Sequence, residues 1–253
     1  GKPEEAYKGL LIARTFRQDD FEVNFNLGLI EFQKRQYEKA LVLLNQAAQT
    51  KPDHAPTLHH LGHAQFKAKR YKEALVNLRK AAELEPEDKD SLFAMGECYY
   101  ELGQNDQAIR IFSHLRADPK LGPNASLFSG TLQLNMRQYQ KAIMDIEIGL
   151  RHPEIPVETL VELKYRLAAA YLRAQELAKA VTVLNEIQSI FPNYKDVPAQ
   201  LAKYRELNSN RNLQIYLMGA TGEFVTLCRR IALSFFPKAK VKITDISVNK
   251  NDW

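Results

Sequence analysis

The sequence contains little of what disulfide-rich, membrane-spanning or secreted chains depend on. It has only two cysteines in 253 residues, and Cys98 and Cys228 lie too far apart in the chain to suggest a disulfide framework. We interpret both as free thiols among apolar helical neighbours, which favours a reducing compartment. No signal peptide is visible, and no apolar run is long enough to span a membrane. Cytoplasmic and periplasmic locations both stay open.

A strong excess of one charge is also missing. The sequence has 35 Lys and Arg residues against 30 Asp and Glu residues, which gives a formal net charge of +5. So mild a charge does not require a nucleic acid partner, and we expect none. The most basic stretch lies near the C-terminus and contains Arg229, Arg230, Lys238, Lys240 and Lys242. We interpret it as a solvated helix face and an edge strand rather than a phosphate-binding site.

Catalytic motifs are absent as well, because no Ser/His/Asp, Cys/His or paired-carboxylate arrangement can be argued. His59 and His63 are four residues apart on one predicted helix face, as two zinc ligands can be, and Glu97 holds the matching place in the next unit. This spacing also arises by chance, and we interpret these side chains as solvated histidines. We therefore predict no metal, no cofactor and no enzymatic activity.

What the sequence does contain is a repeat of small residues. Alanine recurs every 34 residues at five positions, and glycine keeps the same step at four positions. These residues are Ala6, Ala40, Ala74, Ala108 and Ala142, and Gly28, Gly62, Gly96 and Gly130. Small residues let two helices cross closely, and a period near 34 is that of a helix–turn–helix solenoid. Such solenoids present an extended surface that binds other molecules.

The pattern resembles the tetratricopeptide repeat family. The second unit, residues 55–88, shows the positions that carry the resemblance: Leu61, Gly62, Tyr71, Ala74, Leu78, Ala81 and Pro86. The resemblance implies an all-α fold, in the form of a right-handed superhelical solenoid, over residues 21–194. It also implies a general interaction scaffold, and it does not identify the partner.

The repeat divides the chain into four parts. Residues 1–20 match the second helix of a preceding unit, so we expect the chain to be a piece of a longer protein. Five repeats occupy residues 21–194, and residues 195–211 form a capping helix, predicted over residues 197–207, and a polar linker, 208–212. The step from Ala142 to Ala180 is 38 rather than 34, which places four extra residues in the connection 151–158.

The fourth part, residues 212–253, is predicted as the start of a truncated α/β segment. We expect a strand or extended link at 213–218, a turn at 219–222, an amphipathic helix at 223–236 and a strand at 240–248. This segment resembles the opening of the Mrr-type restriction-endonuclease-like domain. The residues that carry this second resemblance are Gly222, Glu223, Phe224, Leu227, Cys228, Ile231, Val241, Lys242 and Ile243. In that family the metal-binding acids and lysine follow this point, so no nuclease site is assigned to this chain.

The tetratricopeptide resemblance also implies that the first helix of each repeat lines a concave, partner-binding groove. The expected groove residues are Phe25, Leu29, His59, His63, Phe93, Glu97, Leu127, Thr131, Tyr165 and Arg173. This aromatic, weakly charged set suits an amphipathic helix or an extended peptide with apolar anchors. For Phe25, Phe93 and Tyr165 we favour ligand contact. Phe32, Phe66 and Tyr100 recur at one place in each repeat, which suits packing equally well.

The leading hypothesis is a non-enzymatic scaffold that binds a protein or peptide segment in this groove. One alternative is a structural component of a large complex, such as the collar of the spirochaete flagellar motor, which the combination of repeats and Mrr-like tail suggests. That alternative predicts self-association or binding to other repeat proteins. The other alternative is a regulatory repeat array attached to an endonuclease-like domain whose site lies beyond residue 253.

Overall fold

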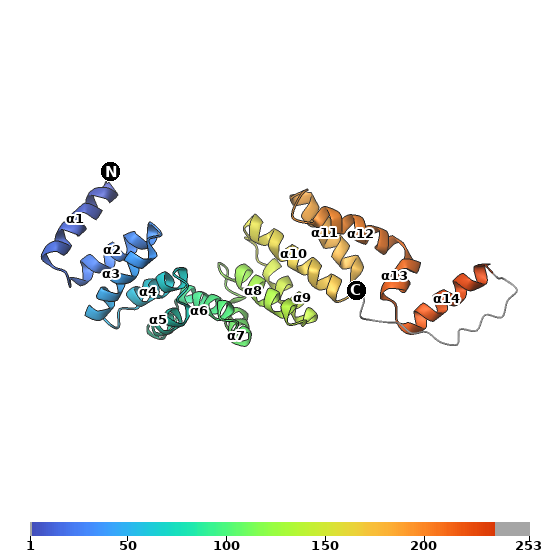
Figure 1. Cartoon of the computed structure of the whole chain (residues 1–253), viewed down its shortest axis with the longest axis horizontal. Helices are drawn as coiled ribbons and strands as arrows, with labels where there is room; N and C mark the ends of the chain where they lie inside the picture. The colour runs from blue at the N-terminus through green and yellow to red at the C-terminus, as the bar shows by residue number, and fades with distance from the viewer. Residues whose placement is uncertain (1, 236–253) are drawn as a thin grey trace. The chain divides into compact units, whose positions relative to one another are not determined.

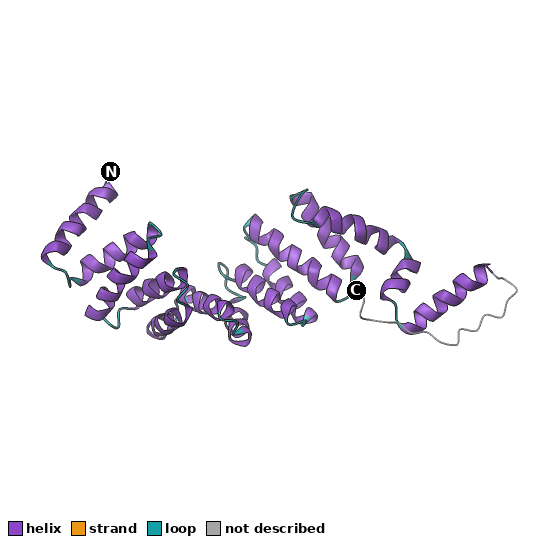
Figure 2. Cartoon of the chain, viewed as in Figure 1, coloured by secondary structure: helices purple, strands orange, loops and turns teal. Residues whose placement is uncertain are grey.

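The computed structural model describes residues 2–235, and every regular element in this part of the chain is an α-helix (Figures 1 and 2). None of the described helices is both long and apolar enough to cross a membrane. The chain divides into two compact units, residues 1–163 and 164–253, and the boundary falls inside α10. The strand expected at 240–248 lies outside the described residues.

The helices alternate as the repeat predicts, and Figure 1 labels them in chain order. The first helices of the repeats are α2 (Phe21–Gln33), α4 (Ala55–Lys67), α6 (Lys89–Glu101), α8 (Gly122–Asn135) and α10 (Val157–Arg173). The second helices are α3 (Tyr37–Thr50), α5 (Tyr71–Leu84), α7 (Asn105–Leu115), α9 (Tyr139–Leu150) and α11 (Leu177–Ile190). Before them lies α1 (Lys2–Phe16), and after them come α12 (Val197–Ser209), α13 (Arg211–Met218) and α14 (Thr221–Phe235). Within residues 1–163, the two helices of each of the first four repeats pack on each other, and α3, α5 and α7 each pack on the first helix of the next repeat.

The turn inside each repeat has one geometry throughout. The fifteenth residue of every repeat adopts a left-handed conformation, with φ between 59° and 69° in Arg35, Lys69, Gly103, Arg137 and Gln175. The amide of the next residue then bonds back to the first helix, as in Gln36 N to Glu31 O and Arg70 N to Gln65 O, at 2.9 and 2.8 Å. This is the Schellman closure, which satisfies carbonyls that the end of a helix leaves unpaired. Backbone hydrogen bonds therefore set the turn, and four of the five turns form without glycine.

The repeated glycines lie where the two helices of a repeat cross. A Cβ atom built on Gly96 would lie 2.7 Å from Cε1 of Phe112, and one on Gly28 would lie 2.7 Å from Cγ of Leu44. Real carbon atoms do not approach so closely, so the crossing requires glycine at these places. The expectation that small residues permit close crossing is confirmed by this geometry.

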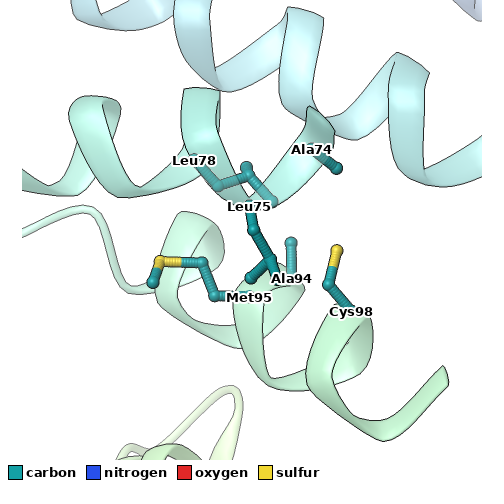
Figure 3. Packing of buried hydrophobic residues seen from close by; sticks show 6 residues of the cluster. All are labelled: Ala74, Leu75, Leu78, Ala94, Met95 and Cys98. Carbon is teal, nitrogen blue, oxygen red and sulfur yellow. The ribbon is translucent and has the colours of Figure 1, made fainter. Parts of the chain in front are cut away.

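The core consists of separate clusters, each lying between neighbouring helices. One cluster joins α5 to α6 through Leu75, Leu78, Met95 and Cys98, and Figure 3 shows these side chains converging between the two helices. Cys98 is fully buried there, and burial raises the pKa of its thiol to about 12. The thiol therefore stays protonated and unreactive, as a packing residue does.

The core between α8 and α9 also holds a charge. The Asp145 side chain is buried, and its Oδ1 accepts a hydrogen bond from Arg116 Nη1 at 2.8 Å. Its Oδ2 accepts bonds from Ser129 Oγ and from Gln133 Nε2, the latter at 3.0 Å. A buried carboxylate is tolerated when its oxygens are hydrogen-bonded in this way.

The four extra residues before the fifth repeat do not lengthen the connection as expected. The connection from α9 to α10 contains residues 151–156, while α10 has 17 residues against 13 in α2, α4 and α6. The prediction that all four residues lie in the connection 151–158 is therefore wrong, because they add a turn to the start of α10. The connection itself is anchored by His152, whose Nε2 lies 2.9 Å from the carbonyl oxygen of Arg116.

The region after α12 also differs from the prediction. Residues 213–218, expected as a strand or extended link, form most of helix α13, and Asn210 caps this helix by accepting a bond from Leu213 N at 3.1 Å. The linker expected at 208–212 reduces to Asn210 alone, because α12 continues to Ser209. The predicted amphipathic helix is present as α14, but Leu227 is its buried residue and Phe235 is 75% exposed. The described part of the expected α/β segment is thus helical.

Candidate partner-binding surface

The ten expected groove residues all lie on the first helices of the repeats. Nine of them are half-buried, and Arg173 is exposed. Eight belong to the unit of residues 1–163, whereas Tyr165 and Arg173 belong to the second unit and are described separately. In the first unit, α2 packs on α4 and α4 packs on α6. The ninth residues of the first four repeats, counted from residues 21, 55, 89 and 123, are Leu29, His63, Glu97 and Thr131, and we call them the ninth-position row.

Two of the aromatic residues assigned to ligand contact also pack between repeats. Phe25 stacks on Phe21 at a ring-centroid distance of 5.7 Å and lies 6.2 Å from the ring of His60 in the next repeat. Phe93 contacts Phe112 at 5.4 Å and Phe128 of the next repeat at 5.8 Å. Both rings therefore contribute to packing within the solenoid, independently of any contact with a ligand.

Three histidine rings of α4 form a cluster, which we call the histidine cluster: His59, His60 and His63. The ring of His59 lies 4.9 Å from that of His60 and 4.4 Å from that of His63. His59 Nδ1 lies 2.7 Å from Asp88 Oδ2 and 2.9 Å from Ser91 Oγ. An ionised carboxylate only accepts hydrogen bonds, so Nδ1 of His59 carries the proton of this contact. This contact ties α4 to the first turn of α6.

The other two histidines of the cluster are kept neutral. Burial, assisted by the nearby His59, lowers the pKa of both His60 and His63 to about 4. The Nε2 atom of His63 is buried and has no hydrogen-bond partner. The rings are therefore half-buried rather than fully solvated, which corrects the expectation of solvated histidines. His54 is not part of the histidine cluster. It caps α4 by accepting a hydrogen bond from Thr57 N at 3.3 Å.

Asp88 is a site residue that the sequence reading missed. Its Oδ1 caps α6 by accepting a bond from Ser91 N at 3.2 Å, and its Oδ2 accepts one from Ser91 Oγ at 2.5 Å. Burial alone would raise the pKa of Asp88, but the bonds from Ser91 and His59 outweigh it and lower this pKa. The sequence does indicate the capping role of Asp88, because an Asp three residues before a Ser at the start of a predicted helix is an N-capping pattern. His59, 29 residues earlier, could not be paired with it from spacing.

Glu97 differs from the other acids of this surface. Its carboxylate is half-buried, and within residues 2–235 the structure gives it neither a hydrogen bond nor an ion pair. Burial raises the pKa of Glu97, Lys67 opposes this shift, and Glu101 adds to it. Lys67 instead lies over the ring of Phe66, at 5.0 Å from Nζ to the ring centroid.

In the second unit, Tyr165 is held by neighbours of its own. Its hydroxyl donates to Asp196 Oδ1 at 2.8 Å, and Lys195 Nζ lies 4.4 Å from its ring centroid. Burial and the bond to Asp196 both raise the pKa of Tyr165. The side chain is therefore pre-oriented by the connection between α11 and α12.

No group of three or more His, Cys, Asp or Glu side chains in the described part of the chain is arranged to hold a metal ion.

In α14, Arg230 is bonded to Asn212 Oδ1 and borders a shallow cavity of about 300 Å³, which is also lined by Ile215 and Leu227.

Comparison with protein families agrees with this architecture. Models of the tetratricopeptide repeat match residues 65–123 and 162–194. A third model, described as subunit 3 of the anaphase-promoting complex or cyclosome and also of tetratricopeptide type, matches residues 10–81. The chain belongs to the tetratricopeptide repeat family. None of the three matches extends beyond Tyr194, so the Mrr-type resemblance of the following segment stays a prediction.

Solved structures of other proteins show the same fold. YrrB matches this tetratricopeptide chain with a TM-score of 0.61 at 17% identity, over 77% of this chain and 97% of that one. MamA matches with a TM-score of 0.61 at 16% identity, over 69% and 95%. PilF of Pseudomonas aeruginosa matches with a TM-score of 0.60 at 20% identity, over 80% and 90%. A search of curated proteins found no match to the sequence.

Proposed function

We propose that this tetratricopeptide chain is a non-enzymatic scaffold that binds a segment of a partner protein along α2, α4, α6 and α8. The observation that carries the proposal is the ninth-position row, Leu29, His63, Glu97 and Thr131, in which every side chain is half-buried. Half-buried side chains on successive helices offer contact area and polar groups without large exposed apolar surface.

The chemistry of the row supports an apolar segment with at least one polar anchor. Leu29 and the aromatic edges of Phe25 and Phe93 provide apolar contact. Glu97 provides a half-buried carboxylate that has neither a hydrogen bond nor an ion pair within the described residues. An amphipathic helix or an extended peptide would satisfy both kinds of contact.

The structural relatives are consistent with this proposal at a general level. YrrB is described as a tetratricopeptide protein with an unusual peptide-binding site. We infer only the mode of use from it, which is recognition of a peptide by a helical repeat surface, and not the residues or the ligand.

The test is a crosslinking pull-down from the cells of origin, with captured proteins identified by mass spectrometry. The blocking variant is Leu127→Arg/Thr131→Arg, which places two long cations on one face of α8. The matched control is Val42→Arg/Val76→Arg on the second helices α3 and α5, where the native side chains are 56% and 68% exposed.

We expect one defined partner to be captured by the wild type and by the control, and to be lost with the blocking variant. Circular dichroism melting of all three proteins ensures that a loss of capture does not reflect unfolding. Equal capture by the blocking variant and the wild type would show that recognition lies elsewhere on the chain.

A further inference from the structure

Glu97 is the one acid on α6 or at its N-cap to which the described structure gives neither a hydrogen bond nor an ion pair. Its neighbours are all engaged: Asp88 with His59 at 2.7 Å, Asp90 with Lys120 at 3.0 Å, and Glu101 with the Tyr71 hydroxyl at 3.3 Å. A half-buried carboxylate has lost part of its hydration, and nothing in residues 2–235 replaces it. A bound cation would therefore meet a carboxylate that has no hydrogen bond or ion pair within the described residues.

The surroundings of Glu97 favour a cation over an anion. Asp88, Asp90 and Glu101 are further negative charges on α6 or at its first turn, so a bound anion would be repelled. His63, in the same position on the adjacent α4, has its pKa lowered to about 4, so it adds no positive charge at pH 7 that would repel a cation. The Glu97 carboxylate accepts hydrogen bonds from an ammonium or guanidinium group.

The aromatic residues of α6 complete the site. Phe93 and Tyr100 lie four residues before and three residues after Glu97, which places both on its face of the helix. Each ring is half-buried, and each is held by an edge-to-face contact with Phe128, at 5.8 and 5.4 Å. Aromatic rings at this spacing attract a cation and also contact the aliphatic stem of a long basic side chain.

Lys67 does not fill this role within the chain. It is close enough to Glu97 to lower its pKa, yet no ion pair joins the two side chains, and Lys67 lies over Phe66 instead. An incoming cation would therefore not have to displace a native ion pair.

We propose that Glu97 is the specificity-determining residue of this surface and binds a lysine or arginine side chain of the partner segment, between the rings of Phe93 and Tyr100. The proposal rests on the function proposed above and adds the charge of the residue that is recognised. Arginine is the better fit of the two, since its planar guanidinium can donate two bonds to one carboxylate.

The probe for the test is a phage-displayed library of random peptides, twelve residues in length, selected against the full 253-residue chain. We expect the enriched peptides to carry Arg or Lys at one fixed distance from an apolar or aromatic residue. Selection against Glu97→Gln should lose this basic position and keep the apolar one. The matched control is Glu83→Gln on the exposed side of α5, which should keep both.

Affinities of one enriched peptide then measure the pairing directly. Glu97→Gln, or Arg→Gln in the peptide, should each weaken binding about tenfold or more, and the two changes together should cost little more than either alone. Glu97→Lys should reverse the preference, binding the peptide with Glu in place of Arg better than the original. Melting of Glu97→Gln at or above the wild-type temperature would show that the fold is intact.

The outcomes separate the two proposals. Peptides whose binding is blocked by Leu127→Arg/Thr131→Arg, but which lack a basic position or bind Glu97→Gln equally well, would overturn the assignment of Glu97 alone. Selection of no peptide, or of peptides indifferent to the blocking variant, would overturn the proposed function together with it.

Discussion

The imidazole of His59 is bonded to Asp88, the residue that caps the next first helix. Nδ1 of His59 and Oδ2 of Asp88 are 2.7 Å apart, while Oδ1 of Asp88 accepts from Ser91 N at 3.2 Å. One carboxylate therefore begins α6 and joins it to α4. Stability in a solenoid is a sum over repeats and their interfaces, and this residue contributes to both.

Asp88→Ala should accordingly lower the free energy of unfolding by about 1–2 kcal/mol, the usual effect of losing an N-cap. The control is Asp53→Ala, which removes an exposed ion pair with Lys80, 2.8 Å apart, and should cost no more than about 1 kcal/mol. Urea unfolding followed by circular dichroism measures both. Equal losses in the two variants would contradict the capping role.

Two glycine-to-alanine changes should act in opposite directions. In Gly96→Ala the new Cβ would lie 2.7 Å from Phe112, and we expect a loss of about 1–3 kcal/mol from overpacking. In Gly9→Ala on α1 the new Cβ meets nothing within 4 Å, and we expect a gain of about 0.5–1 kcal/mol from helix propensity. Thermal melting decides the matter, and a stabilised Gly96→Ala would refute the crossing argument.

The turn residues offer a reciprocal pair of changes. Gly103 has a φ of 69°, so Gly103→Ala should cost about 1 kcal/mol, because a side chain is strained in the left-handed region. Lys69 has a φ of 62° with a side chain present, so Lys69→Gly should be neutral or slightly stabilising. The same urea experiment applies to both, and a neutral Gly103→Ala would show that this strain is negligible.

Stability should decline in acid through the histidine cluster. The pKa of His63 is lowered to about 4 in the folded state, so the unfolded chain takes up a proton near pH 6.5 while the folded chain does not. The contribution of His63 is thus intact above pH 6.5 and is lost as the pH falls towards 4, by on the order of 2 kcal/mol at pH 5. His60 should act in the same direction.

His60→Gln/His63→Gln should therefore flatten the dependence of the melting temperature on pH between 7 and about 4. The control is His114→Gln, which replaces an exposed histidine at the end of α7. An unchanged slope in the double variant would mean that these rings do not resist protonation.

The buried carboxylate of Asp145 should be far more sensitive than the residue before it. Asp145→Ala leaves the buried donors of Ser129 and Gln133 without their acceptor, and we expect a loss of about 2–4 kcal/mol. Met144→Ala removes a side chain that is 62% exposed and should change stability by less than about 0.5 kcal/mol. Comparable losses in the two variants, measured by urea unfolding, would argue against the buried network.

Much of the helical architecture could be predicted because small residues recur wherever two helices of a repeat cross closely. Gly96 must be small to lie against Phe112, and the same need returns every 34 residues. The insertion before the fifth repeat could be counted but not placed, since four residues amount to either a longer loop or one more helical turn. In α10 they form the turn.

Helix α13 was predicted wrongly for a related reason. Residues 213–218 are an apolar run too short to distinguish a strand from a helix by periodicity. The deciding signal was Asn210, interpreted as part of a polar linker, whose side chain caps the helix by accepting from Leu213 N.

For the candidate site, spacing identified which helix face each residue occupies but not its neighbours. Phe93 was assigned to ligand contact, and its ring also lies against Phe112 and Phe128 from two other helices. Burial of the histidine cluster and its link to Asp88 likewise depend on how α4 and α6 pack. Contacts between helices of different repeats cannot be read from one repeat alone.

The turn within each repeat has a consequence for how such a chain can change over time. Its closure uses main-chain amides and carbonyls, and Arg, Lys, Gly and Gln all occupy its left-handed position. When the codons for one 34-residue repeat are duplicated or deleted, the turn of that repeat is gained or lost as a whole. No compensating substitution is needed elsewhere, because the turn closes through its own backbone hydrogen bonds. A lineage built on this turn can lengthen or shorten its array one repeat at a time, while residues such as Glu97 diverge independently in each copy.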